Sequence, residues 1–298
     1  MSRSGSDYPA SDDDGYASPL ARLFLQEDIN FLVTNRLPRH LVTRIAGWYS
    51  RIESPLLARA SIALWKLFAD DLELQDALRT DFRSLHDCFV RELKPEARPI
   101  DPNADVLVSP CDAIVGAHGR VRDGLLVQAK GHRYRVAELL ASEDYARAFA
   151  GGWFVTIYLA PSDYHRVHSP ADATLDHATY VPGELFSVNP RTEAGVPGLF
   201  ARNERLVCAL RTAHGPLALT MVGALIVSGI ETVWQVGPTP DHTASHAPVT
   251  LARGGEIGQF RLGSTVVLCL PPGTYRLADG VRAGEPVRMG APLLQRSG

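Results

Sequence analysis

Apolar residues recur with helical spacing across the first third of the chain, from about Leu20 to Leu93. Within this stretch, steps of four, four, three and four residues align one apolar stripe. The stripe consists of Leu37, Leu41, Ile45, Trp48 and Ile52. This periodicity predicts an amphipathic helix with one broad apolar face.

Two further helices are predicted after this one. Ser54 followed by Pro55 is typical of a helix N-terminus, because serine caps free backbone N–H groups and proline fits the first turn. The helix that starts there contains Leu57, Ile62, Leu64, Trp65 and Phe68. A third helix is predicted from near Thr80 to Pro95, with an apolar stripe formed by Phe82, Leu85, Phe89 and Leu93.

After Pro99 the pattern changes to short apolar runs separated by glycine, proline and aspartate. These runs are rich in Val, Ile, Thr and Leu, which predicts a mostly antiparallel β structure. They are Val106–Val108, Ala113–Ala117, Trp153–Ala160, Leu206–Leu210, Leu217–Val227 and Thr265–Leu270. One helix is predicted near Val136–Ala150. No G-x-G-x-x-G motif opens a βαβ unit, so nothing favours a dinucleotide-binding fold.

The expected fold class is therefore α+β, with N-terminal amphipathic helices on a mostly antiparallel, β-rich catalytic body. We expect an acidic disordered tail over residues 1–16, a helical membrane-docking region over 17–98 and a β-rich domain over 99–298. The chain of 298 residues is 45% hydrophobic, which is enough for a sizeable core. Its net charge of −3 gives no basic field for nucleic acid, so we expect no nucleic-acid partner.

The N-terminal region bears on location. Residues 1–16 contain four aspartates and show neither an apolar signal core nor an arginine-rich transit pattern. No apolar run is long enough to span a bilayer. Between Asn30 and Arg51 there are four arginines and no acid, which suits the surface of an anionic membrane. The alternative is a helix packed on its own domain with a solvated charged face.

Cysteine and lysine usage narrows the chemistry. The four cysteines are widely separated and show no C-x-x-C spacing, which favours reduced thiols over a zinc or redox site. Only three lysines are present, so an enzyme that forms a lysine Schiff base would have few candidates.

Asp112 lies in the string Ser-Pro-Cys-Asp at the end of an apolar run. An aspartate at this position can orient a catalytic histidine. More often, such an aspartate caps a turn through its own backbone.

A second polar cluster surrounds His165 and His168, which lie three residues apart beside Asp163, Tyr164 and Arg166. Histidine titrates near neutral pH, so one interpretation is acid–base chemistry. Another is a metal pair completed by His177 or His118, although no H-E-x-x-H motif is present. A third is a turn histidine that bonds to the backbone.

Gly263 and Ser264 open the last long apolar run. A tight turn is the ordinary explanation. The pair also permits chemistry, because glycine leaves its carbonyl open to attack by the next hydroxyl if the backbone is strained and a base takes the proton. Such an N-to-O acyl shift converts the peptide bond into an ester. Elimination then breaks the chain and leaves a residue that hydrolyses to an N-terminal pyruvoyl group.

The order of the motifs resembles the phosphatidylserine decarboxylase family, whose members are membrane-associated proenzymes. The resemblance runs from about residue 30 to the C-terminus, and its most specific strings are DYHRVH and LGST. The strings are FVRELKPEARPID (89–101), SPCDAIV (109–115), YLAPSDYHRVHSP (158–170), PGELFSVNP (182–190), LFARNERLV (199–207), VGALIVSGIETVW (222–234) and LGST (262–265).

The resemblance implies roles for particular residues. It implies self-cleavage between Gly263 and Ser264, with Ser264 becoming a covalent pyruvoyl group, the only cofactor expected. Asp112, His168 and Ser264 match the family's self-processing triad, in which Asp112 would fix the tautomer of His168. His165 matches the histidine assigned to decarboxylation. The products would be a β chain, 1–263, and an α chain, 264–298. The two chains would form a heterodimer, which could assemble into a higher oligomer.

The resemblance also implies phosphatidylserine in an anionic membrane as the substrate, phosphatidylethanolamine and CO₂ as products, and no metal. Asn189, Asn203 and Arg205 lie in family-like strings and are candidates to touch the head group. Glu231 either stabilises the site or merely ends a strand. The expected location is peripheral, on the cytoplasmic face of a bacterial inner membrane.

Two alternatives stay open at this point. Relatives of the family can act on soluble amino acids, so the same machinery would suit a free aromatic amino acid. A protein of another class, a β-rich binding module with an ordinary glycine–serine turn, would carry the same strands without any chemistry.

Overall fold

The computed structural model describes residues 39–67, 69, 72–224, 229–234, 248–260, 264–273 and 275–296. The predicted tail and the start of the helical region lie outside the described residues, as do Leu37 and Phe68. The helices are α3 (Arg39–Ser50), α4 (Pro55–Trp65), α5 (Leu85–Phe89), α6 (Val136–Leu140), α7 (Glu143–Ala146), α8 (Pro190–Gly195) and α9 (Leu199–Arg202). Short 3₁₀ turns are η1 (Leu74–Asp76), η2 (Ala129–Gly131) and η3 (Arg147–Phe149).

The β-rich prediction for the rest of the chain is confirmed. The first strands are β1 (Val106–Val108), β2 (Ala113–Arg120), β3 (Leu125–Val127), β4 (Arg133–Arg135), β5 (Trp153–Leu159), β6 (Arg166–His168), β7 (Ala173–Val181) and β8 (Arg205–Thr212). The later strands are β9 (Gly215–Val222), β10 (Ile230–Thr232), β11 (Val249–Leu251), β12 (Glu256–Phe260), β13 (Ser264–Leu270), β14 (Tyr275–Leu277), β15 (Pro286–Val287) and β16 (Pro292–Arg296).

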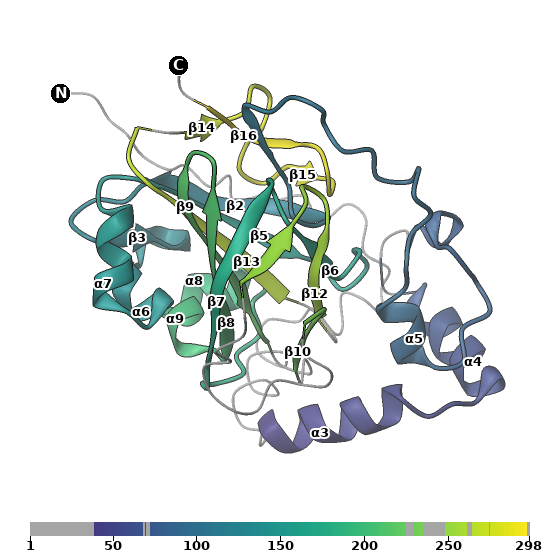
Figure 1. Cartoon of the computed structure of the whole chain (residues 1–298). Helices are drawn as coiled ribbons and strands as arrows, with labels where there is room; N and C mark the ends of the chain where they lie inside the picture. The colour runs from purple at the N-terminus through teal and green to yellow at the C-terminus, as the bar shows by residue number, and fades with distance from the viewer. Residues whose placement is uncertain are drawn as a thin grey trace.

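One eight-stranded sheet dominates the described part of the chain, in the order β11-β7-β8-β9-β13-β5-β2-β15 (Figure 1). Its strand pairs are antiparallel, as predicted. Strand β13 lies inside this sheet, with Thr265 opposite both Tyr158 on β5 and Val222 on β9. A second sheet, in the order β10-β12-β6, carries the two-histidine segment.

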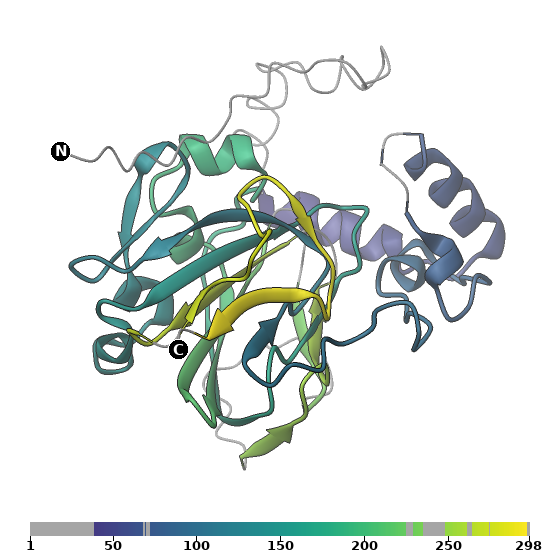
Figure 2. The same cartoon turned by 90° about the horizontal axis from the view of Figure 1, so that it is seen from above.

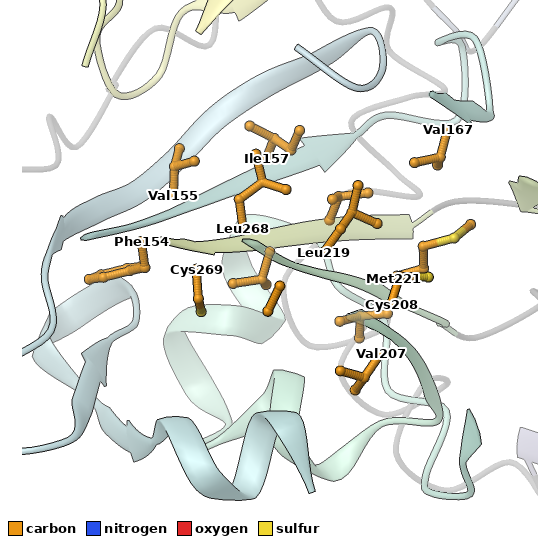
Figure 3. Close-up of a cluster of buried hydrophobic side chains, with 14 of the residues drawn as sticks. Phe154, Val155, Ile157, Val167, Val207, Cys208, Leu219, Met221, Leu268 and Cys269 are labelled. Carbon is orange, nitrogen blue, oxygen red and sulfur yellow. The ribbon is translucent and has the colours of Figure 1, made fainter. Parts of the chain in front are cut away.

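The core packs against both faces of β13. Figure 3 shows Phe154 and Cys269 on one face of the sheet, with Ile157 and Leu268 on the other. All four side chains are at most 1% exposed. The alternation along each strand places successive side chains on opposite faces, so apolar residues at nearly every position of β5 and β13 indicate a sheet that is covered on both sides.

The helical N-terminal region is confirmed for α3 and α4, while the third predicted helix is wrong in length. The Ser54 hydroxyl accepts a hydrogen bond from the backbone N–H of Leu57 at the start of α4. The third helix is predicted from Thr80, but α5 spans only Leu85–Phe89. It begins at Leu85 because the hydroxyl of Ser84 accepts a hydrogen bond from the backbone N–H of Asp87. Beyond its end, Leu93 pairs instead with Ala77 in a β-bridge.

Two expectations in the body need correction. The helix predicted over Val136–Ala150 is broken into α6, α7 and η3, because Ala141 adopts a left-handed conformation with φ 51° and Ser142 starts a new helix by capping Tyr145 N–H. The strand predicted over Leu217–Val227 ends at Val222, and residues 225–228 lie outside the described part.

The helices occupy two sides of the molecule. Helices α4 and α5 lie on the side of the sheets away from α6 and α7 (Figures 1 and 2). Among the described residues, the helices are too short and too polar for any of them to cross a bilayer.

Ile157 provides a test of how strongly the two-faced core stabilises the fold. Its side chain is 0% exposed between β13 and β2, so Ile157→Ala should lower the free energy of unfolding by about 2–5 kcal/mol. Ile114 on β2 is 36% exposed, and Ile114→Ala should cost less than about 1 kcal/mol. Urea titration followed by circular dichroism measures both; equal costs would contradict this account of the core.

Candidate active site

Ser264 begins β13, where it lies opposite Leu159 of β5. The residue is 0% exposed, and its Oγ atom is buried and has no hydrogen-bond partner among the described residues. Burying a hydroxyl without a partner is unfavourable, so such a group calls for an explanation beyond packing. Gly263, the other half of the predicted cleavage site, lies outside the described residues.

His168 ends β6 and is held by two hydrogen bonds to its ring. Its Nδ1 lies 2.9 Å from the carbonyl oxygen of Gly254, and its Nε2 lies 3.0 Å from the hydroxyl of Tyr164. A carbonyl oxygen only accepts, so Nδ1 carries the proton, and Nε2, the basic atom of the neutral ring, accepts from the Tyr164 hydroxyl. Burial lowers the pKa of His168, and the Gly254 carbonyl opposes that shift. The ring is therefore a neutral base at neutral pH.

Asp112 lies close to this histidine through the backbone, because His168 N–H donates to the carbonyl of Pro110 at 2.7 Å. Its carboxylate, however, binds the Arg98 guanidinium at 2.6–3.0 Å and accepts from Met289 N–H at 2.8 Å. The contact expected from Asp112, which fixes the tautomer of His168, is made in this structure by Gly254. Asp112 still acts on His168 through its negative charge, which raises the pKa of the ring.

Arg98 organises the surroundings of Asp112. It is 4% exposed and also donates to Asp76 at 2.8 Å and to Glu73 at 2.7 Å. Burial by itself would lower the pKa of Arg98, but its hydrogen bond and charge attraction to Asp112 raise it overall. The guanidinium thereby joins the end of the 109–112 segment to the acidic turn η1.

His165 has a different environment from His168. It is 0% exposed, and neither ring nitrogen makes a hydrogen bond of ordinary geometry with any residue that the structure describes. The ring stacks on Phe89 of α5, with centroids 4.0 Å apart and an angle of 20° between the planes. Burial, followed by the nearby charge of Arg91, lowers the pKa of His165 to about 3. The imidazole is therefore neutral and protected from solvent.

The histidine pair contacts β12, the strand that precedes the predicted cleavage site in the sequence. The carbonyl of His165 accepts from Phe260 N–H at 2.9 Å, and Glu256 pairs with His168 across β12 and β6. Strand β12 ends at Phe260 and β13 starts at Ser264. The buried serine therefore begins one of the two strands next to the predicted cleavage site, and both histidines contact the other strand. Such a set suits attack by serine with a histidine base.

The other sequence candidates are engaged in scaffold contacts. Asn189 caps α8 by accepting from Thr192 N–H at 2.8 Å. Asn203 is 0% exposed and bonds the backbone of Phe186 and Gly223, and Arg205 donates to backbone carbonyls of Leu139, Glu138 and Asn203.

Glu231 lies on β10 and accepts from the Gln259 amide on β12 at 2.6 Å. Its contact thus spans the pair of strands that leads to the cleavage segment. Asn189, Asn203 and Arg205 use their side chains to hold backbone groups in place, which accounts for their presence in the family-like strings. They do not form part of the arrangement around Ser264 described above.

The metal interpretation needs His118 or His177 as a further ligand beside the 165–168 pair. His118 lies on β2 and His177 on β7, which are separated by β5, β13, β9 and β8 in the large sheet. Within the described ranges, no group of three His, Cys, Asp or Glu residues is arranged to hold a metal ion.

Comparison with known proteins agrees with the motif order. A family model described as phosphatidylserine decarboxylase matches residues 85–295. The phosphatidylserine decarboxylase proenzyme of Shewanella amazonensis is 45% identical over 272 residues, which cover 86% of this chain and 94% of that protein. The chain belongs to the phosphatidylserine decarboxylase family.

Proteins of two other organisms give the same result. The proenzyme of Aliivibrio fischeri is 44% identical over 270 residues, covering 86% of this chain and 94% of that protein. The proenzyme of Hahella chejuensis is 42% identical over 274 residues, covering 88% of this chain and 92% of that protein. The resemblance stated from the motifs is therefore confirmed, and the non-catalytic binding module loses its support.

Sequence reasoning missed several residues around the site of this phosphatidylserine decarboxylase family member. Arg98, Arg91 and Phe89 all lie in the string 89–101 that carried the resemblance, but none was assigned a role there. The signal available was the apolar stripe that includes Phe89. Tyr164 was named in the polar cluster, but its bond to His168 and the contact from Gly254 became visible only through the fold.

The acidic group nearest the histidine pair in sequence, Asp163, gives a pH test. Burial raises its pKa from 3.8 to about 7, so the folded state holds a proton that the unfolded chain loses, and stability falls as pH rises through this range. His165 has the opposite effect. Its pKa falls from 6.5 to about 3, so its contribution to the stability of the fold rises with pH between these two values. In the parent the two contributions oppose each other.

Asp163→Asn should remove only the loss of stability that Asp163 causes as pH rises. Its side-chain oxygen can still accept from Ala160 N–H, as Asp163 does at 2.7 Å. The variant should gain about 1–3 kcal/mol of stability relative to the parent between pH 4 and pH 7.5. Urea titrations at several pH values measure this difference. Parallel stability–pH curves for the two proteins would show that Asp163 is ionised in the fold.

Proposed function

We propose that this chain decarboxylates phosphatidylserine to phosphatidylethanolamine and CO₂ after cutting its own backbone between Gly263 and Ser264. The observation that carries the proposal is the fully buried Ser264 hydroxyl, which has no hydrogen-bond partner within the part of the chain that the structure describes. Together with the family's proenzyme names, this fits a serine whose hydroxyl serves chemistry rather than the fold. The same observation fits Ser264 as the source of a pyruvoyl group.

In self-processing, Ser264 Oγ attacks the carbonyl carbon of Gly263, and Nε2 of His168 accepts the hydroxyl proton. The C–N bond breaks, the Ser264 amine takes a proton, and an ester joins the two segments. Elimination then releases residues 1–263 with a free carboxylate. The dehydroalanine that remains at position 264 adds water and loses ammonia, which leaves a pyruvoyl group. Asp112 supports the positive charge that develops on His168, and Arg98 holds the Asp112 carboxylate in place.

For decarboxylation, the pyruvoyl carbonyl supplies the electron sink that an α-amino acid needs to lose CO₂. The chain's own residues bind the substrate, exclude water and return a proton to the α-carbon. His165 is the proposed donor of that proton. Its low pKa in the closed fold would rise when the anionic substrate enters, because a nearby negative charge favours the protonated ring.

The fold supports a stable pair of chains after cleavage. Strand β13 belongs to the α chain 264–298 and pairs with β5 on one side and β9 on the other, both of which belong to the β chain. Every residue of β13 is buried. The α chain would therefore stay inserted in the sheet as a heterodimer, held by two ladders and the core.

Helices α3 and α4 offer a surface for lipid. Ile45, Trp48, Leu56 and Leu64 are 56–79% exposed. Arg44 and Arg51 line a shallow groove of about 470 Å³ beside Trp48. Exposed apolar side chains between cationic ones suit the interface of an anionic membrane. This surface favours the lipid over a free amino acid as the substrate and a peripheral location at a membrane surface.

The histidine roles predict different failures. The parent should separate into two chains in denaturing conditions, with the smaller chain starting in a pyruvoyl group. Ser264→Ala and His168→Ala should leave the chain uncut, with His168→Ala slowing cleavage by at least about 10²-fold. His165→Ala should cut itself but lose CO₂ release. Intact-mass measurement and release of labelled CO₂ from phosphatidylserine report the two steps.

Arg211→Gln is the matched control, because its ion pair with Asp176 lies on an exposed strand face. It should cut and release CO₂ as the parent does. A parent chain that stays intact in the mass spectrum would defeat the proposed chemistry. Equal cutting defects in the two histidine variants would remove the division of roles between them.

Trp48→Ala should weaken binding to vesicles of phosphatidylserine and phosphatidylglycerol by about 5–30-fold, because it removes an apolar side chain that is 68% exposed. Arg44→Gln should weaken binding about fivefold, and only to anionic vesicles at low salt. Vesicle co-sedimentation measures both. Leu78→Ala, at a residue 54% exposed outside α3 and α4, is the control. Equal losses for Trp48→Ala and Leu78→Ala would contradict docking through α3.

A further inference from the structure

Arg91 follows α5 and is buried with part of its guanidinium unused. The residue is 4% exposed. Its Nη2 donates to the carbonyls of Leu72 at 2.9 Å and Ser162 at 3.2 Å. Its Nε and Nη1 atoms are buried and have no hydrogen-bond partner in the described part of the chain. Two donors of a permanent cation therefore remain free.

Other arginines nearby do not share this condition. Arg98 binds three carboxylates, and Arg166 pairs with Glu256 at 2.8 Å and Glu92 at 3.2 Å. Arg91 makes no such ion pair with any carboxylate of the described residues. A buried charge is costly unless it is paired, and burial accordingly lowers the pKa of Arg91. An arriving anion would complete the site.

The position of Arg91 connects it to the reacting region. Ser162, one of its backbone partners, lies in the loop that follows Leu159, and Leu159 is opposite Ser264 in the sheet. The same loop leads to His165, whose pKa is lowered by the charge of Arg91. Phe89, two residues before Arg91, stacks on the His165 ring. The free donors thus belong to the segment that packs against both the histidine and the loop beside the serine.

We propose that Arg91 forms an anion subsite that binds the phosphodiester of the substrate head group through Nε and Nη1. This inference rests on the proposed function and names a binding residue for it. The phosphodiester suits the subsite better than the substrate carboxylate does. Strong binding of the carboxylate would stabilise the ground state against CO₂ loss, whereas the phosphodiester keeps its charge from substrate to product. Guanidinium groups bind phosphate oxygens through charge-assisted hydrogen bonds.

Occupation of this subsite has a consequence for His165. A phosphodiester would offset the positive charge of Arg91, which is one of the causes that keep the ring unprotonated. Protonation of His165 would then accompany substrate binding. The subsite would thereby couple recognition of the head group to the supply of the proton for the α-carbon.

Two soluble product analogues isolate the phosphodiester. Glycerophosphoethanolamine and ethanolamine share the amine, but only the first carries the phosphodiester. In neutral detergent micelles, the parent should prefer glycerophosphoethanolamine as an inhibitor, and Arg91→Gln should reduce that preference by about 10–100-fold. Arg91→Lys should restore part of it. Lys94→Gln removes an exposed charge three residues away and should leave it unchanged.

A second measurement is independent of turnover. Inorganic phosphate should raise the midpoint of thermal unfolding of the Ser264→Ala chain above that in sodium chloride at equal ionic strength. The same shift should be absent from the Ser264→Ala, Arg91→Gln chain. This comparison remains available if Arg91→Gln alone fails to cut itself.

The outcomes separate the two proposals. An active parent whose inhibitor preference and phosphate-dependent shift survive Arg91→Gln would overturn the subsite and leave the proposed function intact. A parent that neither cuts itself nor releases CO₂ would overturn the proposed function, while a phosphate-dependent shift lost with Arg91→Gln would still support an anion site.

Discussion

The two hydrogen-bond ladders of β13 are the constraint on which the arrangement around Ser264 depends. They fix the first residue of the strand against Leu159 on β5 and the next against Val222 on β9. A strand held on both edges cannot slide by one residue without turning its apolar side chains to the wrong face. The Ser264 hydroxyl is therefore delivered to one buried position, although it forms no hydrogen bond of its own. The same ladders would keep a cleaved α chain in the sheet.

Around that serine, the structure separates its two histidines by environment. His168 has a partner for each ring nitrogen, and its tautomer is set by a backbone carbonyl. His165 has an aromatic neighbour and no ordinary hydrogen bond, so its charged form is strongly disfavoured. Two residues of one type thus differ in proton affinity because their surroundings differ. This contrast is the physical basis for giving them separate roles in cleavage and decarboxylation.

Charge around the site is distributed through the segment that joins the helices to the sheets. Arg98 neutralises Asp112 and binds the acidic turn η1, so the helical region is tied to the 109–112 segment by a buried ionic cluster. Arg91, in the same segment, has spare donors. Helices α3 to α5 and the β-rich body are therefore connected through residues 89–98. The family match begins at residue 85, with α5.

Local patterns in the sequence determined the class of the fold, because strand alternation, turn residues and helix caps act over a few residues. They predicted β1, β5, β8 and β13 and the Ser54 cap of α4. They failed for α5 and for the break at Ala141, where neighbouring segments and caps override helical spacing. The motif order identified Asp112, His165, His168 and Ser264 as candidates. Only the tertiary structure decided their partners, since Arg98, Gly254 and Phe89 reach them across 14 to 86 positions of sequence, and such contacts depend on how the sheets and helices pack.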